Sequence, residues 1–279
     1  MSAKTWFITG TSRGFGREWA LAALERGDTV AATARNTASL DDLVVKFGDA
    51  VLPIALDVTD RDADYAAVAQ AHEHFVKLDV VINNAGYGQF GMVEELTEDD
   101  LRAQIETNLF GAIWVTQAAL PYLRAQGHGH IIQVTSIGGI SAFPNIGAYH
   151  ASKWGLEGLT QALAQEVADF GIKVTLVEPG GYATDWGGSS ASHATQLPAY
   201  SGAREKAAIA RAKRVGTLGD PQATRAAILT IVDADVPPLR VFFGDGPLAT
   251  ASADYESRLA TWREWEPVSI AAHGRSTDR

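Results

Sequence analysis

Short apolar segments rich in β-branched residues alternate with segments of helical periodicity along most of the chain. Most of these apolar runs have no polar face, as expected of strands in a parallel sheet that helices cover on both sides. The alternation predicts a doubly wound, three-layer α/β fold around a mostly parallel sheet of seven strands. The expected strands are Thr5–Ile8, Thr29–Thr33, Val51–Leu56, Val80–Ile82, Ile131–Thr135, Lys173–Val177 and Arg240–Phe243. The expected helices are Gly14–Arg26, Asp60–Phe75, Glu98–Arg124, Ala148–Phe170 and Pro221–Ala234.

Composition narrows the class of protein further. We expect a single domain over residues 1–279, a length that can bury one large core. The absence of Cys excludes disulfides, Cys-ligated metals and a thiol nucleophile, and is compatible with a reducing cytoplasm. A formal net charge of −10 argues against general nucleic-acid binding. The longest unbroken apolar run, Trp19–Leu24, is far shorter than a membrane span of ~20 residues, and no signal peptide is expected. These features predict a cytoplasmic protein.

One region interrupts the strand–helix rhythm. From Asp185 to about Tyr200 the chain is rich in small residues with embedded aromatics, and a basic helical segment, Arg204–Arg214, follows. A long irregular insertion after a strand is either a functional lid or a plain linker. Because the insertion carries Trp186 and Tyr200, we favour a substrate-binding lid over about residues 185–215.

A glycine-rich turn, Thr9-Gly-Thr-Ser-Arg-Gly-Phe-Gly16, joins the first strand to the first helix. Glycines at this junction allow the backbone to approach a pyrophosphate, whose charge the helix N-terminus then meets. A tight turn without a ligand is the alternative. At the end of the second strand Arg35 stands where NAD-binding proteins commonly carry a carboxylate. Arg35 and Arg13 together suit the 2′-phosphate of NADP, unless both are simply solvated surface arginines.

The strongest catalytic signal is Tyr149-His-Ala-Ser-Lys153, with Ser136 at a strand end 13 residues upstream. Residues four apart share a helix face, so the ammonium of Lys153 can lie near the phenol of Tyr149. A cation ~4 Å from a phenol, at an effective dielectric near 20, is worth ~4 kcal/mol, or about three pKa units before desolvation is subtracted. We therefore expect Tyr149 to act as an acid or base near neutral pH.

These motifs occur together in a recognisable order. The glycine turn, Asn83-Asn84-Ala85-Gly86, Asn108, Ser136, the Tyr149–Lys153 motif and Pro179-Gly180-x-x-x-Thr184 have the order and spacing of the short-chain dehydrogenase/reductase family. Over about residues 4–184 the chain resembles the NADP-preferring branch of that family, which has a Rossmann-type fold. The resemblance implies that Tyr149 is the general acid/base and that Lys153 binds the nicotinamide ribose and lowers the tyrosine pKa. It also implies that Ser136 binds the substrate oxygen and that Asn108 holds a water in a proton relay.

The resemblance also implies two sets of binding residues. The expected cofactor contacts are Gly10, Ser12, Arg13, Gly14, Phe15, Gly16, Arg35, Asp57, Val58, Asn84, Ala85, Gly86, Tyr149, Lys153, Pro179, Gly180 and Thr184. The expected substrate contacts are Ser136, Gly139, Phe143, Tyr149, Tyr182 and Trp186. Because the substrate wall is largely apolar and has no cationic clamp, we expect a hydrophobic ketone or aldehyde and its alcohol, with NADP(H) preferred and NAD(H) as the alternative cofactor.

Two other functions stay open from the sequence. One is a non-catalytic NADP-binding sensor of the same fold, although such proteins usually lose the Tyr or Lys that this chain keeps. The other is an isomerase or dehydratase, whose relatives mostly carry a different glycine motif and a larger C-terminal domain. The family resemblance further implies a homodimer or homotetramer formed through the helices Glu98–Arg124 and Ala148–Phe170.

The remaining His and Trp residues give weaker signals. The pairs His72/His74 and His128/His130 lack metal-ligand spacing with a carboxylate, so we expect no metal. His150 follows the catalytic tyrosine, but adjacent helix positions point apart, so we do not expect it to be the base. The pair Trp262 and Trp265 near the C-terminus predicts packing in a core or an interface.

Overall fold

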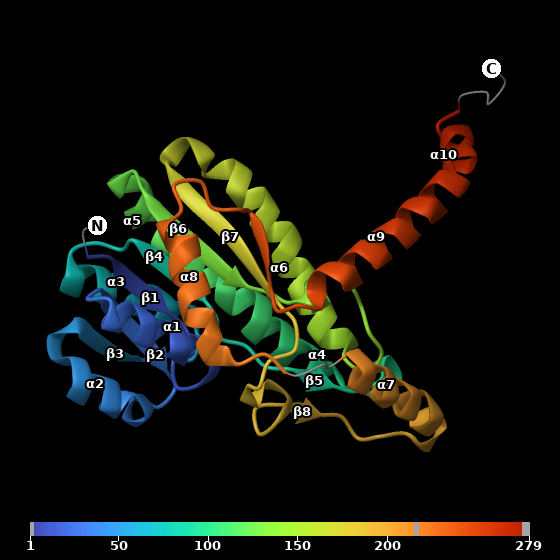
Figure 1. Cartoon of the computed structure of the whole chain (residues 1–279), viewed down its shortest axis with the longest axis horizontal. Helices are drawn as coiled ribbons and strands as arrows, with labels where there is room; N and C mark the ends of the chain where they lie inside the picture. The colour runs from blue at the N-terminus through green and yellow to red at the C-terminus, as the bar shows by residue number, and fades with distance from the viewer. Residues whose placement is uncertain (1–2, 215–217, 275–279) are drawn as a thin grey trace.

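The fold is built on one seven-stranded sheet of order β3-β2-β1-β4-β6-β7-β9 (Figure 1). It is taken from a computed structural model that describes residues 3–214 and 218–274. Every pairing in the sheet is parallel; for example, Ile8 of β1 lies between Ala32 and Ile82 of its two neighbours. The strands are β1 (Thr5–Ile8), β2 (Thr29–Ala34), β3 (Val51–Ala55), β4 (Val80–Asn83), β6 (Gly129–Val134), β7 (Ile172–Pro179) and β9 (Arg240–Phe243). This confirms the predicted doubly wound fold, and the predicted strand ends are correct to within two residues.

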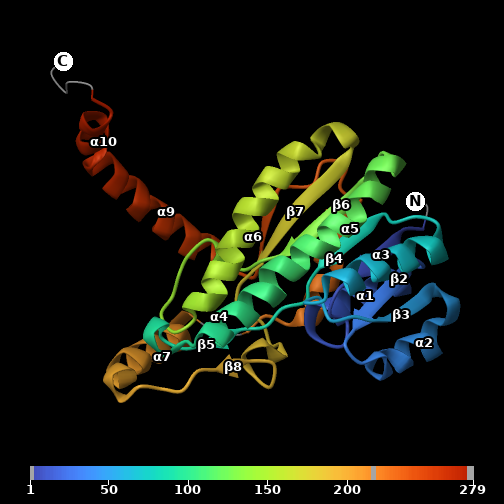
Figure 2. The same cartoon turned by 180° about the vertical axis from the view of Figure 1, so that it is seen from behind.

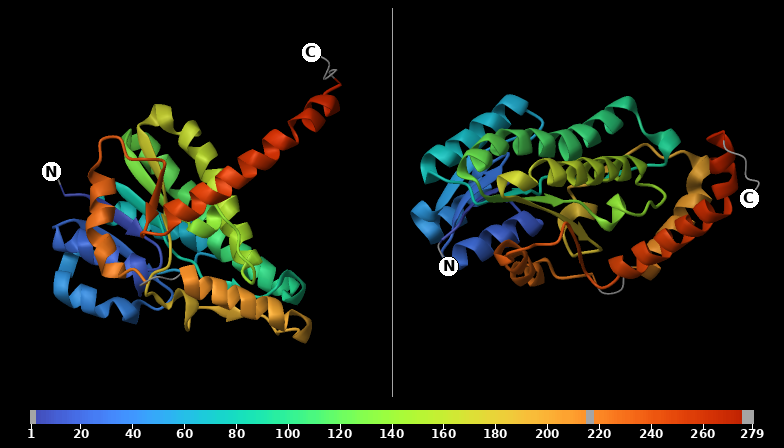
Figure 3. Two further views of the ribbon diagram at one scale, coloured as in Figure 1. Left: turned by 45° about the vertical axis from the view of Figure 1, so that its right-hand side comes forward. Right: turned by 90° about the horizontal axis from the view of Figure 1, so that it is seen from above.

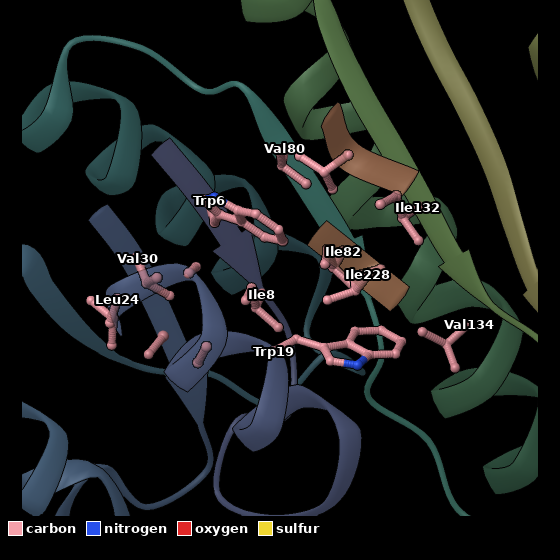
Figure 4. Close-up of a cluster of buried hydrophobic side chains, with 14 of the residues drawn as sticks. Trp6, Ile8, Trp19, Leu24, Val30, Val80, Ile82, Ile132, Val134 and Ile228 are labelled. Atoms are coloured by element: carbon pink, nitrogen blue, oxygen red, sulfur yellow. The ribbon is translucent and has the colours of Figure 1, made fainter. Parts of the chain in front are cut away.

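Helices cover both faces of the sheet, as the apolar strands require (Figures 1 and 2). One face packs against α1 (Gly14–Glu25), α2 (Asp41–Phe47) and α8 (Thr224–Asp233). The other face packs against α3 (Arg61–Phe75), α5 (Gly111–Gln126) and α6 (Gly147–Glu166). In Figure 4 the indole of Trp19 from α1 lies among Ile8, Ile82 and Ile228. Its Nε1 donates to Thr224 Oγ1 at 2.8 Å, so the polar atom of this buried side chain is satisfied.

Four helical regions differ from the predictions. The segment expected as one helix from Glu98 is α4 (Glu98–Ile105), a π-helical turn (Glu106–Phe110) and then α5. The helix expected to reach Phe170 ends at Glu166 and is followed by a 3-10 turn. The sequence analysis missed α2 and both C-terminal helices, α9 (Pro247–Glu264) and α10 (Glu266–Ala272). α2 is a helix of only seven residues, so its core-facing residues Leu43, Val44 and Phe47 span little more than one turn, and α9 and α10 bury few of their apolar residues.

The insertion that follows β7 runs along the carboxyl ends of the strands. Its strand β8 (Ser192–His193) pairs in parallel with the short β5 (Gln89–Phe90), and α7 (Ser201–Arg214) follows as the basic helix. Residue 215, the last of the expected lid region, lies outside the described residues. Within 3–214 and 218–274, no helix combines the length and the apolar character that crossing a bilayer requires.

Candidate active site

A crevice of about 1960 Å³ opens where the carboxyl ends of the sheet strands meet the insertion. This edge is where doubly wound sheets bind their ligands. Nearly all of the predicted site residues line the crevice, from Gly10 at the first strand to Trp186 in the insertion. Three predicted residues do not line it: Gly16, Asn108 and Gly139.

The glycine turn at the start of α1 is shaped by close backbone contacts. Gly10 and Gly14 have positive φ angles of 71° and 60°, which L side chains rarely adopt. A Cβ on Gly16 would lie 2.4 Å from the carbonyl oxygen of Gly10, so Gly16 allows the helix to pack directly under the turn. Asn84 closes the turn from β4, because its Nδ2 donates to the carbonyl oxygens of Thr9 and Gly10 at 2.9 and 3.0 Å. The turn is therefore a rigid cradle, and Gly16 supports it from below without lining the crevice.

The two arginines expected at a 2′-phosphate have different surroundings. Arg35 is exposed directly after β2 and has no hydrogen bond or ion pair among the described residues. The guanidinium of Arg13 instead lies 2.5 Å from Asp185 Oδ2 and 3.3 Å from Ser189 Oγ. Hydrogen bonds from Ser189, more than Arg13 itself, hold the pKa of Asp185 below its usual value. The glycine turn is thus tied to the insertion through Arg13, whereas Arg35 is available for an anion.

The proposed catalytic side chains come from β6, α6 and the π turn. Ser136 Oγ accepts from the backbone N–H of Gly138 at 2.9 Å. The Lys153 Nζ donates to the Val134 carbonyl at 2.7 Å and lies 5.9 Å from the centre of the Tyr149 ring. Asn108 is 1% exposed and accepts from the Tyr87 N–H at 3.0 Å while donating to the Tyr87 carbonyl at 2.9 Å. The π turn places Asn108 behind the crevice wall. Such π-helical turns are frequent at functional sites.

The expected lowering of the Tyr149 pKa is wrong for this structure. Burial raises the pKa of Tyr149 to about 12, and a hydrogen bond with Ser136 acts in the opposite direction. Burial also lowers the pKa of Lys153 to about 8, while the charge of Glu157 favours the ammonium. An ammonium ~4 Å from a phenol lowers the pKa of the phenol only if desolvation is smaller than the Coulomb attraction, and in the structure desolvation is the larger effect.

A buried carboxylate beneath Ser136 was missed by the sequence analysis. Glu157 is 5% exposed, and its Oε1 accepts from Thr135 Oγ1 at 2.7 Å. Its Oε2 accepts from Arg240 Nε at 3.0 Å. A Cβ on Gly139 would lie 3.0 Å from Glu157 Cγ, so Gly139 packs on this carboxylate and does not face the substrate as predicted. The four-residue spacing from Lys153 on one helix was the available signal for Glu157.

The insertion lies directly over Tyr149. The ring centroids of Trp186 and Tyr149 are 4.9 Å apart, and Trp186 also lies 5.5 Å from Phe90 of β5. At the far end of the insertion, Arg204 forms a bidentate ion pair with the buried Glu95 at 2.9 and 2.8 Å. These hydrogen bonds hold the pKa of Glu95 well below its usual value. Residues 109 positions apart form this pair, so no local sequence pattern could have indicated it.

Two further residues near the substrate wall have structural roles. His150 Nδ1 lies 2.7 Å from the Gly138 carbonyl, and its Nε2 accepts from the Phe143 N–H at 2.8 Å. The neutral imidazole therefore connects two points of the loop after Ser136, and burial lowers its pKa. Tyr182 lines the crevice, but its ring packs edge-on against Phe15 at 4.9 Å, beside the glycine turn. Within 3–214 and 218–274 there is no group of His, Cys, Asp and Glu residues suited to a metal ion.

The fold and the crevice together define an oxidoreductase of the dinucleotide-binding α/β class. The chain belongs to the short-chain dehydrogenase/reductase family, because a family model described as "short chain dehydrogenase" matches residues 4–195. It is 44% identical over 271 residues to "Oxidoreductase BOA17" of Botryotinia fuckeliana (strain B05.10), covering 96% of this chain and 99% of that protein.

Two further comparisons agree with this family. The chain is 37% identical over 241 residues to a "3-ketodihydrosphingosine reductase" of Bacteroides thetaiotaomicron, covering 85% of this chain and 86% of that protein. The crystal structure of a short-chain dehydrogenase from Streptomyces avermitilis matches with a TM-score of 0.89 and 41% identity, covering 97% of this chain and 98% of that one. The family uses a nicotinamide dinucleotide, NAD(H) or NADP(H), as its cofactor.

Proposed function

We propose that this protein is an NADP(H)-dependent oxidoreductase that interconverts a hydrophobic ketone or aldehyde and its alcohol. The observation that carries the proposal is the convergence of Ser136, Tyr149 and Lys153 at one end of the crevice, with the exposed Arg35 at its border. We further propose that residues 1–279 form one domain, that the protein is cytoplasmic, and that it is a homodimer or homotetramer.

The described residues fit a dinucleotide. Gly10 and Gly14 have positive φ angles at which a residue with a Cβ would be strained. Because these positions carry no side chain, the backbone of the cradle can lie close to a pyrophosphate. Val58, Ala85 and Pro179 continue the crevice wall toward Lys153. We assign the cofactor contacts predicted from the sequence to this surface, with Gly16 and Asn108 as supports behind it.

Arg35 is the basis of the proposed NADP preference. Its guanidinium can form charge-assisted, bidentate hydrogen bonds with a phosphate, and no carboxylate pairs with it among the described residues. A carboxylate at this position would repel a 2′-phosphate.

The chemistry at Tyr149 follows from where charge develops. When bound, the cofactor supplies or accepts the hydride at the substrate carbon. In the direction of reduction, the substrate oxygen gains negative charge, which Tyr149 and Ser136 stabilise as hydrogen-bond donors. Tyr149 donates its phenolic proton to that oxygen, and its raised pKa of about 12 keeps the phenol protonated at neutral pH. Lys153, whose ammonium lies on the same helix face, stabilises the phenolate that remains.

The covering wall favours an apolar substrate. Phe90, Phe143 and Trp186 line the crevice around Tyr149. Burying the hydrocarbon part of a substrate against these three aromatic side chains is favourable, which supports an apolar substrate. The 3-ketodihydrosphingosine reductase among the relatives is named for a ketone with a long apolar chain, and such a ketone belongs to the substrate class proposed here.

The test is a substrate panel with both cofactors. Purified protein is mixed with NADPH or NADH and with ketones and aldehydes of increasing chain length, each matched with a keto acid, and absorbance at 340 nm is followed. We expect turnover with NADPH that improves with apolar chain length, and none with Tyr149→Phe, which should still bind NADPH. NADPH binding without turnover across the panel would instead support the sensor, and equal use of NADH would refute the cofactor preference.

A further inference from the structure

The two C-terminal helices form an arm, residues 247–272, that projects from the body of the protein (Figures 1 and 3). Only its first half touches the body: Asp254 Oδ2 accepts from Ser141 Oγ at 3.0 Å, and Arg258 donates to the Ile140 carbonyl at 2.9 Å. Every described residue after Arg258 is exposed. Because most helical stability in proteins comes from packing of one face, the second half of the arm lacks the contacts that usually stabilise such an element.

An apolar stripe runs along this arm. Spacings of seven, four and three residues place its members on one side of α9. Its members, with their exposed fractions, are Leu248 (66%), Tyr255 (46%), Leu259 (40%) and Trp262 (60%). Trp265 and Val268, exposed by 59% and 56%, extend the apolar surface into α10. Contiguous exposed apolar surface of this kind marks an interaction site.

The charges beside the stripe identify the occupant. Glu256 and Arg263 are seven residues apart, or about two helical turns, and so lie on the same flank of the stripe. Neither side chain has a hydrogen bond or ion pair among the described residues. If two arms cross in antiparallel orientation between residues 259 and 260, Glu256 of each meets Arg263 of the other. The arm carries four acidic and two basic residues. An anionic membrane surface offers no cation to pair with Glu256 and is disfavoured as the occupant, whereas a second copy offers Arg263.

We propose that the arm pairs in antiparallel orientation with the arm of a second copy of this chain, burying both apolar stripes and forming two Glu256–Arg263 ion pairs. In this arrangement α10 of each copy lies beside the first turn of α9 of the other. That turn borders the crevice at Pro247 and Thr250. The pairing therefore brings each subunit's C-terminal helix to the rim of its neighbour's candidate active site.

The experiment is a charge-swap cycle followed by sedimentation velocity on the full chain between about 1 and 100 µM. We expect the unmodified protein to be dimeric or larger. Glu256→Arg and Arg263→Glu each replace two attractive contacts with two repulsive ones and should each weaken association about tenfold. The double variant Glu256→Arg/Arg263→Glu should restore association to within about threefold of the unmodified protein.

Matched controls separate this surface from others. Ser257→Arg adds a charge on the opposite side of α9 and should leave association unchanged, whereas Trp262→Asp should abolish pairing through the arm. Circular dichroism melting confirms that each variant is folded. A monomer at 100 µM, single charge variants that associate normally, or a double variant no better than the singles would each overturn the proposal. The proposal would also be overturned if Trp262→Asp kept the oligomeric state of the unmodified protein, since the interface would then lie elsewhere.

Discussion

Replacing Glu157 with Gln tests the electrostatics beneath the candidate catalytic residues. Glu157 lies one helical turn from Lys153, and its charge favours the ammonium, whose pKa is about 8. Gln keeps the size of the side chain and can still accept from Thr135 Oγ1, but it removes the charge. The pKa of Lys153 then falls further, so the ammonium is lost at a lower pH than in the unmodified enzyme.

The size of the shift can be worked from the geometry. Residues four apart on a helix have Cβ atoms roughly 5–6 Å apart, and charges at about 6 Å and an effective dielectric near 20 interact with ~2.8 kcal/mol, or about two pH units. Arg240, with Nε 3.0 Å from Glu157 Oε2, partly cancels the field of the carboxylate at Lys153. Burial and the charge of Glu157 raise the pKa of the neighbouring Glu178 to about 8, so Glu178 ionises more readily in Glu157→Gln and replaces part of the lost charge. We therefore expect a shift of about one pH unit.

The assay is the pH profile of kcat/KM for NADPH-dependent ketone reduction between pH 6 and 10. The pKa of Tyr149 is about 12, so its phenol stays protonated over this range, and loss of the Lys153 ammonium sets the alkaline limb. The limb should move to lower pH in Glu157→Gln. Thr135→Val is the matched control, because it removes the 2.7 Å hydrogen bond and keeps the charge. An alkaline limb that stays in place in Glu157→Gln, or that moves equally in Thr135→Val, would refute the electrostatic reasoning.

Three further predictions concern the cofactor, the insertion and the core. Arg35→Ala should lower the ratio of kcat/KM for NADPH over NADH about tenfold or more, since hydrogen bonds to charged groups contribute about 1.5–3 kcal/mol; an unchanged ratio would exclude Arg35 from the 2′-phosphate. Hydrogen exchange of residues 185–200 should slow when NADPH and an apolar ketone are bound, and no change would favour a plain linker. Trp19→Ala should destabilise the fold by about 3–5 kcal/mol in urea unfolding, because it opens a cavity and removes the indole N–H that donates to Thr224 Oγ1; a loss below about 1 kcal/mol would contradict this.

The fold was predictable because its signals are local. β1 begins and ends where the predicted apolar run does, since a parallel strand buried along its whole length has no polar face to blur its limits. The arm of α9 and α10 was missed because its apolar pattern is sparse. The large apolar residues of α9 are Leu248, Tyr255, Leu259 and Trp262, and mostly small or polar residues stand between them. The prediction that Trp262 and Trp265 pack in a core or interface stays a prediction, because both are about 60% exposed in a single chain.

The residues of the candidate site were predictable, but their energetics were not. The order of the motifs indicated Ser136, Tyr149 and Lys153, and the strand ends bring them to one crevice. The pKa of Tyr149 depends on burial beneath the insertion, and the charge on Lys153 depends on Glu157. Both effects come from segments packed together by the tertiary fold, so a motif cannot report them.

The three cations assigned to the cofactor differ in what they can contribute. Lys153 is buried and bound to the Val134 carbonyl, so it is fixed in position and acts on the reacting end. Arg13 is paired with Asp185, so any contact with a phosphate requires it to exchange one anion for another. Because Asp185 starts the insertion that lies over Tyr149, that exchange would link cofactor binding to the position of the covering segment. Arg35 has no competing carboxylate among the described residues, and cofactor discrimination in this acidic chain should therefore rest mainly on it.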